Sequence, residues 1–410
     1  MTGAMVLPAI ESSRSTRTEG GRRLLAVCPV PLWPGNNGYS LRVVRLLREL
    51  ARDWEIYLVS AASPPGDDQT STLDLAGHTS VELGGRIVTM PWQFDSERLR
   101  PAVAEVVATR RPHAALLWSG SEFLAPLSGV SSVVGDRIDC ATVAGWRALP
   151  THRSFRGRAA ALRVAGRAAW YERNAVRALH AMTVVGDADA TVLRLLSGRR
   201  TVYVVPNGVD AGPVPRPELE SDEPSVVFTG VMSFGPNVEA ARYFADHVWP
   251  LVYAKRPDAR FVIAGRSPLP AIVELGERPG VTLLPDVPSI DAVLSTCWLA
   301  VAPMRTGTGI KNKVLEAWAA GKPVVMSPLA RNGLRVQGPV ADLVAREPDH
   351  FASLVLSLLE DPERRLRLGL AAREAVTRAH SWPGAAAQLT RLLSGGRGDM
   401  GTDGGDGPVV

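Results

Sequence analysis

The segment from Pro303 to Val325, PMRTGTGIKNKVLEAWAAGKPVV, places glycines and charged side chains where a phosphate group could be held. Gly307 and Gly309 lie between a predicted strand and a helix that is predicted to start near Ile310. Amide groups at such a helix start are unpaired and carry the positive end of the helix dipole. Glycines let an anion approach the backbone. The spacing therefore indicates an anion site.

Charged side chains follow these glycines. Lys311 and Lys313 add positive charge on different faces of the predicted helix. Glu316 lies about two turns after Thr308 and is expected to point toward a cleft, where its carboxylate could accept hydrogen bonds from two ribose hydroxyls. Taken alone, the segment is equally compatible with an ordinary crossover helix that begins with glycine and carries a glutamate facing solvent.

Other predicted strands end in comparable turns. In FTGVMSFGPN, residues 228–237, Gly230 opens space for a phosphate group after a strand. The remaining turns are VVPNGVD (204–210), FVIAGRSP (261–268) and GVTLLPDV (280–287).

Together, these landmarks resemble the carboxyl-terminal half of retaining family 4 glycosyltransferases of the GT-B fold, and most closely the sugar transferases associated with bacterial exopolysaccharide loci. The resemblance implies that Glu316 binds the ribose of a nucleotide sugar and that the backbone of Thr308, Gly309 and Ile310 binds its diphosphate. It also implies that residues 285–287, which include Asp286 and Val287, recognise the base. Asp286 has an alternative interpretation as a turn or cap residue.

Two positions depart from the family pattern. The family has two glutamates eight positions apart, and Thr308 stands at the first position. The loop of residues 230–237 also lacks the usual arginine and lysine. The diphosphate charge must then be met elsewhere, and the candidates are Arg266, Arg305, Lys311 and Lys313.

The amino-terminal half is expected to bind the acceptor. Asn37, Gly38 and Arg42 lie where its first loop should face the cleft, although a solvated loop and a surface arginine would also fit. Asp136 and Asp139 end a predicted strand and could bind acceptor hydroxyls or orient a base. Paired acids at a strand end are also common helix caps and turn formers.

Short β-branched runs alternate with longer amphipathic segments along the chain, which predicts an α/β protein with parallel sheets. The pattern restarts after the Pro-rich stretch 211–224, so two doubly wound Rossmann-like domains should face each other across a cleft, as in the GT-B fold. The expected parts are a disordered leader (1–20), an acceptor-binding domain (21–205), a nucleotide-sugar-binding domain (206–380), a helix packing back on the first domain (381–394) and a disordered tail (395–410).

The composition fits this organisation. The 410 residues are 46% hydrophobic and 21% charged, which excludes a disordered or collagen-like chain. Three scattered cysteines predict neither a disulfide framework nor a CxxC metal site. No apolar run approaches the ~18 residues of a membrane span, so we expect a cytoplasmic protein.

Residues 151–180 carry seven arginines and one acidic residue, Glu172. A basic amphipathic helix can lie on anionic lipid, and we consider peripheral contact with the inner face of a membrane on this ground. An ordinary solvated helix is the alternative.

The expected function is transfer of a sugar from a nucleotide-diphosphate sugar to a hydroxyl of a saccharide or lipid-linked saccharide. The resemblance implies retention of anomeric configuration, with no metal and no cofactor beyond the donor substrate. A nucleotide-sugar 2-epimerase and a catalytically degenerate nucleotide-sugar-binding subunit are the alternatives. An NAD enzyme is disfavoured because the first loop lacks GxGxxG, and nothing indicates a nucleic-acid partner.

Overall fold

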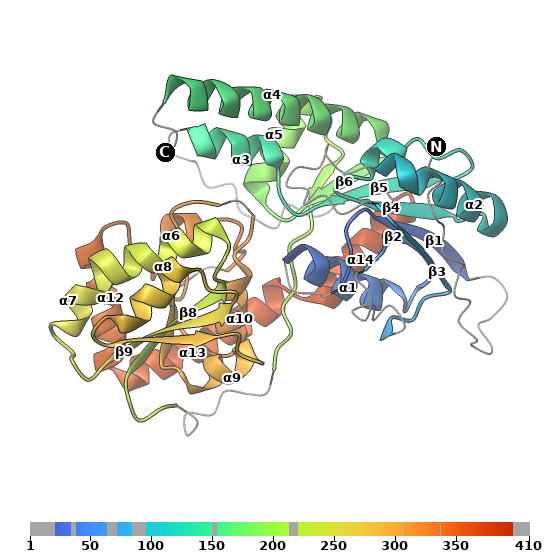
Figure 1. The fold of residues 1–410 in the computed structure, drawn as a ribbon. Coiled ribbons are helices and arrows are strands. Elements are labelled where there is room, and N and C mark those ends of the chain that lie inside the picture. Colours follow the sequence, from blue (N-terminus) through green and yellow to red (C-terminus); the bar gives the residue numbers. More distant parts are fainter. Residues whose placement is uncertain are drawn as a thin grey trace.

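The computed structural model of the chain contains two α/β domains joined by a linker (Figure 1). The structure describes residues 21–33, 38–63, 72–83, 96–149, 154–212, 220–307, 309–336 and 338–396. Every strand pairing in the described parts is parallel, as the alternating pattern predicts. The predicted fold class is confirmed.

The amino-terminal domain is built on a sheet whose seven described strands have the order β3-β2-β1-β4-β5-β6-β7. The strands are β1 (Arg22–Cys28), β2 (Trp54–Ala61), β3 (Gly77–Val81), β4 (Ala114–Trp118), β5 (Ser132–Arg137), β6 (Ala181–Val184) and β7 (Val202–Val204). The described helices are α1 (Gly38–Leu50), η3 (Ser96–Leu99), α2 (Arg100–Arg110), η4 (Glu122–Leu124), α3 (Ala141–Ala148), α4 (Phe155–Ala178) and α5 (Asp187–Ser197).

The central strand β1 shows why this sheet forms. Its run Leu24–Cys28 is buried throughout, and Leu24 pairs with Ile56 on one side and Ala114 on the other. Continuous apolar strands are typical of parallel sheets that helices cover on both faces. Two clusters of apolar side chains lie on the two faces accordingly.

The carboxyl-terminal domain contains five described strands in the order β10-β9-β8-β11-β12. They are β8 (Ser225–Val231), β9 (Arg260–Arg266), β10 (Val281–Pro285), β11 (Leu299–Ala302) and β12 (Val324–Met326). Its described helices are α6 (Gly235–Tyr243), η7 (Phe244–Val248), α7 (Trp249–Tyr253), α8 (Pro270–Val273), η8 (Glu274–Glu277), α9 (Ile290–Thr296), α10 (Asn312–Ala319), α11 (Pro328–Arg331), α12 (Pro348–Glu360) and α13 (Pro362–Ala379). A last helix, α14 (Trp382–Leu393), follows them.

Helix α14 lies beside α1 and packs on the amino-terminal domain (Figure 1). Its buried side chains, among them Trp382 and Leu389, join an apolar cluster with Leu46 and Trp54. The chain therefore crosses between the domains twice, once in the linker and once before α14.

Some elements differ from the expectation. The sequence pattern predicted neither β3, whose sequence GHTSV contains no apolar run, nor α3. The stretch 348–393, for which the pattern predicts helix with one break at residues 381–383, is broken at Asp361 as well. The side chains of Asp361 and Ser381 each accept a hydrogen bond from the first turn of the next helix. Within the described residues, no helix is both long and apolar enough to cross a membrane.

Candidate functional site

The glycine turn, which we define as Arg305–Gly307 with Gly309 and Ile310, follows β11 and leads into α10. Gly307 and Gly309 have φ values of 103° and 66°, a region that glycine adopts without steric cost. Lys311 is extended, with φ −93° and ψ 92°, so α10 begins at Asn312 rather than near Ile310. The amides of Gly309 and Ile310 therefore precede the helix instead of forming its first turn.

The amino-terminal domain contacts this turn through Asp139 and Arg147. A Cβ atom on Gly309 would lie only 2.2 Å from Oδ1 of Asp139. From α3, Arg147 Nη1 donates a hydrogen bond of 3.4 Å to the Gly307 carbonyl oxygen. The glycine turn and the end of β5 thus meet across the domain boundary.

Lys311 and Asp189 are buried close to this contact. Lys311 Nζ donates to the Gly309 carbonyl oxygen at 2.8 Å, and burial lowers its pKa to about 8, opposed by the charge of Asp139. Burial raises the pKa of Asp189 in α5 to about 7, and Asp139 adds to this while Arg147 opposes it. Sequence reasoning missed Asp189 and Arg147, because each lies in a helix that gives no local sign of facing a cleft.

A second lysine lies beneath the loop after β8. Lys313 Nζ donates to Oδ1 of Asn237 at 2.8 Å and lies 3.8 Å from the ring centroid of Phe228. A Cβ atom on Gly230 would lie 3.1 Å from this ammonium group. Loss of hydration lowers the pKa of Lys313 to about 7, opposed by Glu316. The loop lacks basic residues of its own, and α10 places the amino group of Lys313 beneath it.

Arg42 and Asp136 form a fully buried ion pair. Arg42 donates to both carboxylate oxygens of Asp136, at 2.7 and 2.8 Å, and its Nη1 donates to Oδ1 of Asn207 at 2.8 Å. Thr183 donates a further hydrogen bond to Asp136. Asn207 Nδ2 in turn donates to Oδ1 of Asn312 at 2.9 Å. We call the series Asp136, Arg42, Asn207 and Asn312 the interdomain relay, because it links β5 to the start of α10.

Glu316 lines a cavity of about 890 Å³ between the domains. The walls come from α1, from residues 208–212 after β7, from α9 and α10, and from Trp382 of α14. Burial raises the pKa of the Glu316 carboxyl group, and the ammonium group of Lys313 opposes this shift. Asp291 and Asn312 are among the other polar groups of this cavity.

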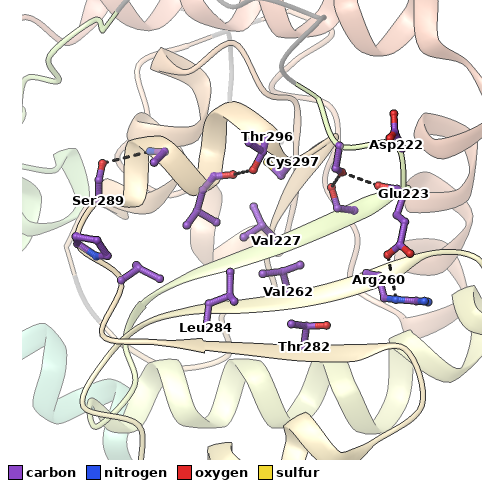
Figure 2. A pocket seen from close by; sticks show the side chains of 16 residues that line it. Asp222, Glu223, Val227, Arg260, Val262, Thr282, Leu284, Ser289, Thr296 and Cys297 are labelled. Carbon is purple, nitrogen blue, oxygen red and sulfur yellow. Dashed lines mark hydrogen bonds and ion pairs between the residues drawn. The ribbon is translucent and has the colours of Figure 1, made fainter.

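The predicted base-binding loop, residues 285–287, contributes to a second cavity rather than to this one, and the next residues, Pro288 and Ser289, line both. Asp286 has φ 48°, and its Oδ1 accepts a hydrogen bond of 2.9 Å from the Ser267 amide, so it joins the loops after β9 and β10. Val287 lines the second cavity, of about 640 Å³, which is shown in Figure 2. There Val262 and Leu284 of the sheet face Thr296 and Cys297 near α9, and Arg260 pairs with Glu223 at one end (Figure 2). Arg266 is exposed at the end of β9.

The remaining predicted residues divide into two groups. Asn37 and Thr308 lie outside the described residues. Gly38 begins α1, where a Cβ atom would lie 3.4 Å from Nδ2 of Asn312. Arg305 lies over the ring of Tyr243, with 4.7 Å between its guanidinium carbon and the ring centroid. In the parts of the chain that the structure describes, no three His, Cys, Asp or Glu side chains are grouped to hold a metal ion.

Comparisons with known proteins agree with this geometry. Residues 223–361 match the protein family described as glycosyl transferases group 1. The alpha-maltose-1-phosphate synthase of Mycolicibacterium smegmatis is 31% identical over 259 residues, which are 54% of this chain and 65% of that protein. The matched region thus spans less than two thirds of the length of this curated relative.

Solved structures resemble nearly the whole chain. A sucrose-phosphate synthase from Thermosynechococcus elongatus superposes with a TM-score of 0.69 at 16% identity, over 90% of this chain and 98% of that one. Anabaena HepE in complex with UDP and glucose gives a TM-score of 0.63 at 15% identity, over 91% and 100%. The region from β8 to α12 therefore carries the match to the glycosyl transferases group 1 family, and the chain as a whole has the GT-B fold.

Proposed function

We propose that this protein is a glycosyltransferase that moves a sugar from a nucleotide-diphosphate sugar to a hydroxyl of a saccharide or lipid-linked saccharide. The observation that carries the proposal is the position of Glu316. It lies in the segment that matches the family and lines the cavity between the domains, about two turns of backbone after the glycine turn.

The nucleoside of the donor would occupy the cavity of about 890 Å³, which lies in the size range of small-molecule sites. The Glu316 carboxylate accepts hydrogen bonds only, so two ribose hydroxyls are suitable donors for it. Pro288 and Ser289 line this cavity directly after residues 285–287, so the base would contact the carboxyl end of this loop. Anabaena HepE, which has the same fold, was crystallised with UDP, so UDP is the first nucleotide to test.

The diphosphate would lie at the glycine turn. The Gly309 and Ile310 amides precede α10, and Lys311 and Lys313 supply positive charge from two sides. Fixed amides and cations stabilise a leaving diphosphate as the glycosidic bond breaks, because they need no reorganisation during the reaction. The sugar would pass through an oxocarbenium-like state.

In this proposal, Asp139 binds the acceptor. It projects from the amino-terminal domain against Gly309, so an acceptor hydroxyl bound to it would lie near the anomeric carbon of a donor held by the turn. For retention, the donor phosphate oxygen takes the acceptor proton on the face from which the leaving group departs. Asp189 lies beside this point, and the charge of Arg147 opposes the rise in its pKa.

Arg42 and Asp136 have a different part in this proposal. Their hydrogen-bonding groups point at each other and at Asn207 rather than into the cavity. We assign them to positioning: they fix Asn207, which holds Asn312 at the start of α10. Closing the domains on this contact excludes water, which otherwise competes with the acceptor.

A thermal-shift panel of UDP, GDP, dTDP, ADP and CMP, each with and without magnesium, tests the proposal. A ligand that binds only the folded state raises the melting temperature by mass action. One diphosphate should do so without magnesium, and Glu316→Gln should abolish the shift while the control Glu274→Gln, at an exposed position, keeps it. If no nucleotide changes the melting temperature, the transferase proposal fails and a degenerate subunit is favoured. Turnover of the donor to an epimerised nucleotide sugar would instead identify a 2-epimerase.

A further inference from the structure

We propose that the outer face of α4, with the adjoining end of α3, binds an anionic lipid bilayer and presents the catalytic cleft to an acceptor carried on a lipid. The part of this inference that concerns the acceptor rests on the proposed function. The membrane contact rests on the surface itself.

The apolar part of this surface consists of large apolar side chains that are exposed to solvent. Phe155, Leu162 and Trp170 are 87%, 49% and 63% exposed. At 3.6 residues per turn they lie within about a quarter of the circumference of α4. Trp146 on the neighbouring α3 is 59% exposed. In the described part of the chain, three of the four exposed tryptophan and phenylalanine side chains thus belong to this pair of helices.

The charged side chains that α4 exposes on the same surface are all arginines. Helix α4 contains six arginines, at positions 156, 158, 163, 167, 173 and 177, and its single acidic residue is Glu172. Glu172 is fully buried, where Arg137, the Ala141 amide and Thr142 donate hydrogen bonds to its carboxylate. No acidic side chain of α4 therefore reaches solvent. Helix α3 contains no acidic residue.

Arginines beside exposed aromatic and leucine side chains fit the interface of an anionic bilayer. The arginines meet lipid phosphates, and the aromatic and aliphatic groups enter the boundary with the acyl chains. A nucleic acid would use the arginines but would leave Leu162 in water. Figure 1 shows α4 running along the outer side of the amino-terminal domain, so a flat surface could reach it.

The surface adjoins the candidate site. Arg147, next in sequence to Trp146, donates its hydrogen bond to Gly307 in the glycine turn. A bilayer in contact with α3 and α4 would therefore lie beside the end of the cleft at which the sugar is transferred. This geometry favours an acceptor whose hydroxyl projects from a lipid.

Co-sedimentation with vesicles tests the inference on the full chain, without any donor. Binding to vesicles of two parts phosphatidylcholine and one part phosphatidylglycerol should exceed binding to pure phosphatidylcholine, and high salt should weaken it. Since each arginine near such a surface contributes about fivefold, Arg163→Glu with Arg173→Glu should lower binding by at least about twentyfold. Phe155→Ser with Trp170→Ser should also release the protein from the vesicles.

The matched control is Leu366→Ser with Leu370→Ser, which removes two exposed leucines from α13 of the other domain and should leave binding unchanged. Circular dichroism and release of UDP from UDP-glucose by each variant show whether the fold and the donor site are intact. Equal binding to both vesicle types, or none, overturns the inference even if the enzyme is active. A dimer in solution that Phe155→Ser with Trp170→Ser dissociates would overturn it in favour of a contact between copies. If vesicles bind and no nucleotide does, the membrane surface stands and the proposed function falls.

Discussion

Substituting Gly309 by alanine probes the point where the two domains meet. At φ 66°, an alanine adopts the left-handed conformation at a cost of roughly 1–2 kcal/mol. Gly198 at the end of α5 has nearly the same φ, 68°, and open space around its Cβ position. Gly198→Ala therefore measures the backbone cost alone and is the matched control.

Gly309→Ala adds a steric conflict to this cost. The new methyl carbon would lie 2.2 Å from Oδ1 of Asp139, whereas ordinary contact begins at 3.4 Å. Either Asp139 or the glycine turn must then move by roughly 1 Å, and a misplacement of that size near reacting groups costs on the order of 100-fold in rate. We expect kcat/KM for a donor such as UDP-glucose to fall by about that factor in Gly309→Ala and to change little in Gly198→Ala.

Both variants should lose a similar free energy of unfolding, within about 1 kcal/mol of each other, because the side chain of Asp139 is exposed and its carboxylate can shift without disturbing the core. Denaturant titration measures this, and UDP release measures the rate. Gly309→Ala should also reduce the thermal shift by nucleoside diphosphate. Adding Asp139→Ala removes the obstacle and should restore that shift. If Gly309→Ala keeps kcat/KM within about threefold of Gly198→Ala, the glycine turn is not the point at which the reacting groups are held.

Two further predictions concern the lysine beneath the β8 loop and the interdomain relay. Because the pKa of Lys313 is lowered to about 7, the side chain is mostly neutral at pH 8, and a bound diphosphate should recharge it with uptake of up to about one proton. Calorimetry in buffers of different ionisation enthalpy should detect this uptake; Lys313→Met should remove most of it, and an unchanged value would place the diphosphate elsewhere. In the relay, Asn207→Ala and Asn312→Ala each remove the hydrogen bond of 2.9 Å between these two side chains. Asn207→Ala also leaves a buried N–H group of Arg42 without its acceptor, so Asn207→Ala should lose about 1–3 kcal/mol of unfolding free energy. A double-mutant cycle by denaturant titration should give a coupling of at least about 0.5 kcal/mol, and additive losses would mean that the two amides do not act together.

The sequence by itself determined the features that depend on neighbouring positions. Alternation of apolar strands with amphipathic helices predicted two parallel α/β domains, and the structure contains both sheets. The position of Glu316 in the cavity wall agrees with the predicted orientation toward a cleft, although the segment alone left a glutamate facing solvent equally open. These results follow from backbone periodicity, which acts over a few residues.

The tertiary structure alone decided which distant side chains meet. Arg42 and Asp136 are 94 positions apart and form a buried pair, although each could equally have faced solvent or an acceptor. Asp189 and Arg147 come to the glycine turn from separate helices, and Lys313 lies under a loop 76 positions before it. Such contacts depend on how whole helices pack against sheets and how the domains face each other. No local pattern encodes that arrangement, because the same residue types in the same short segments would satisfy a helix cap or a solvated surface equally well.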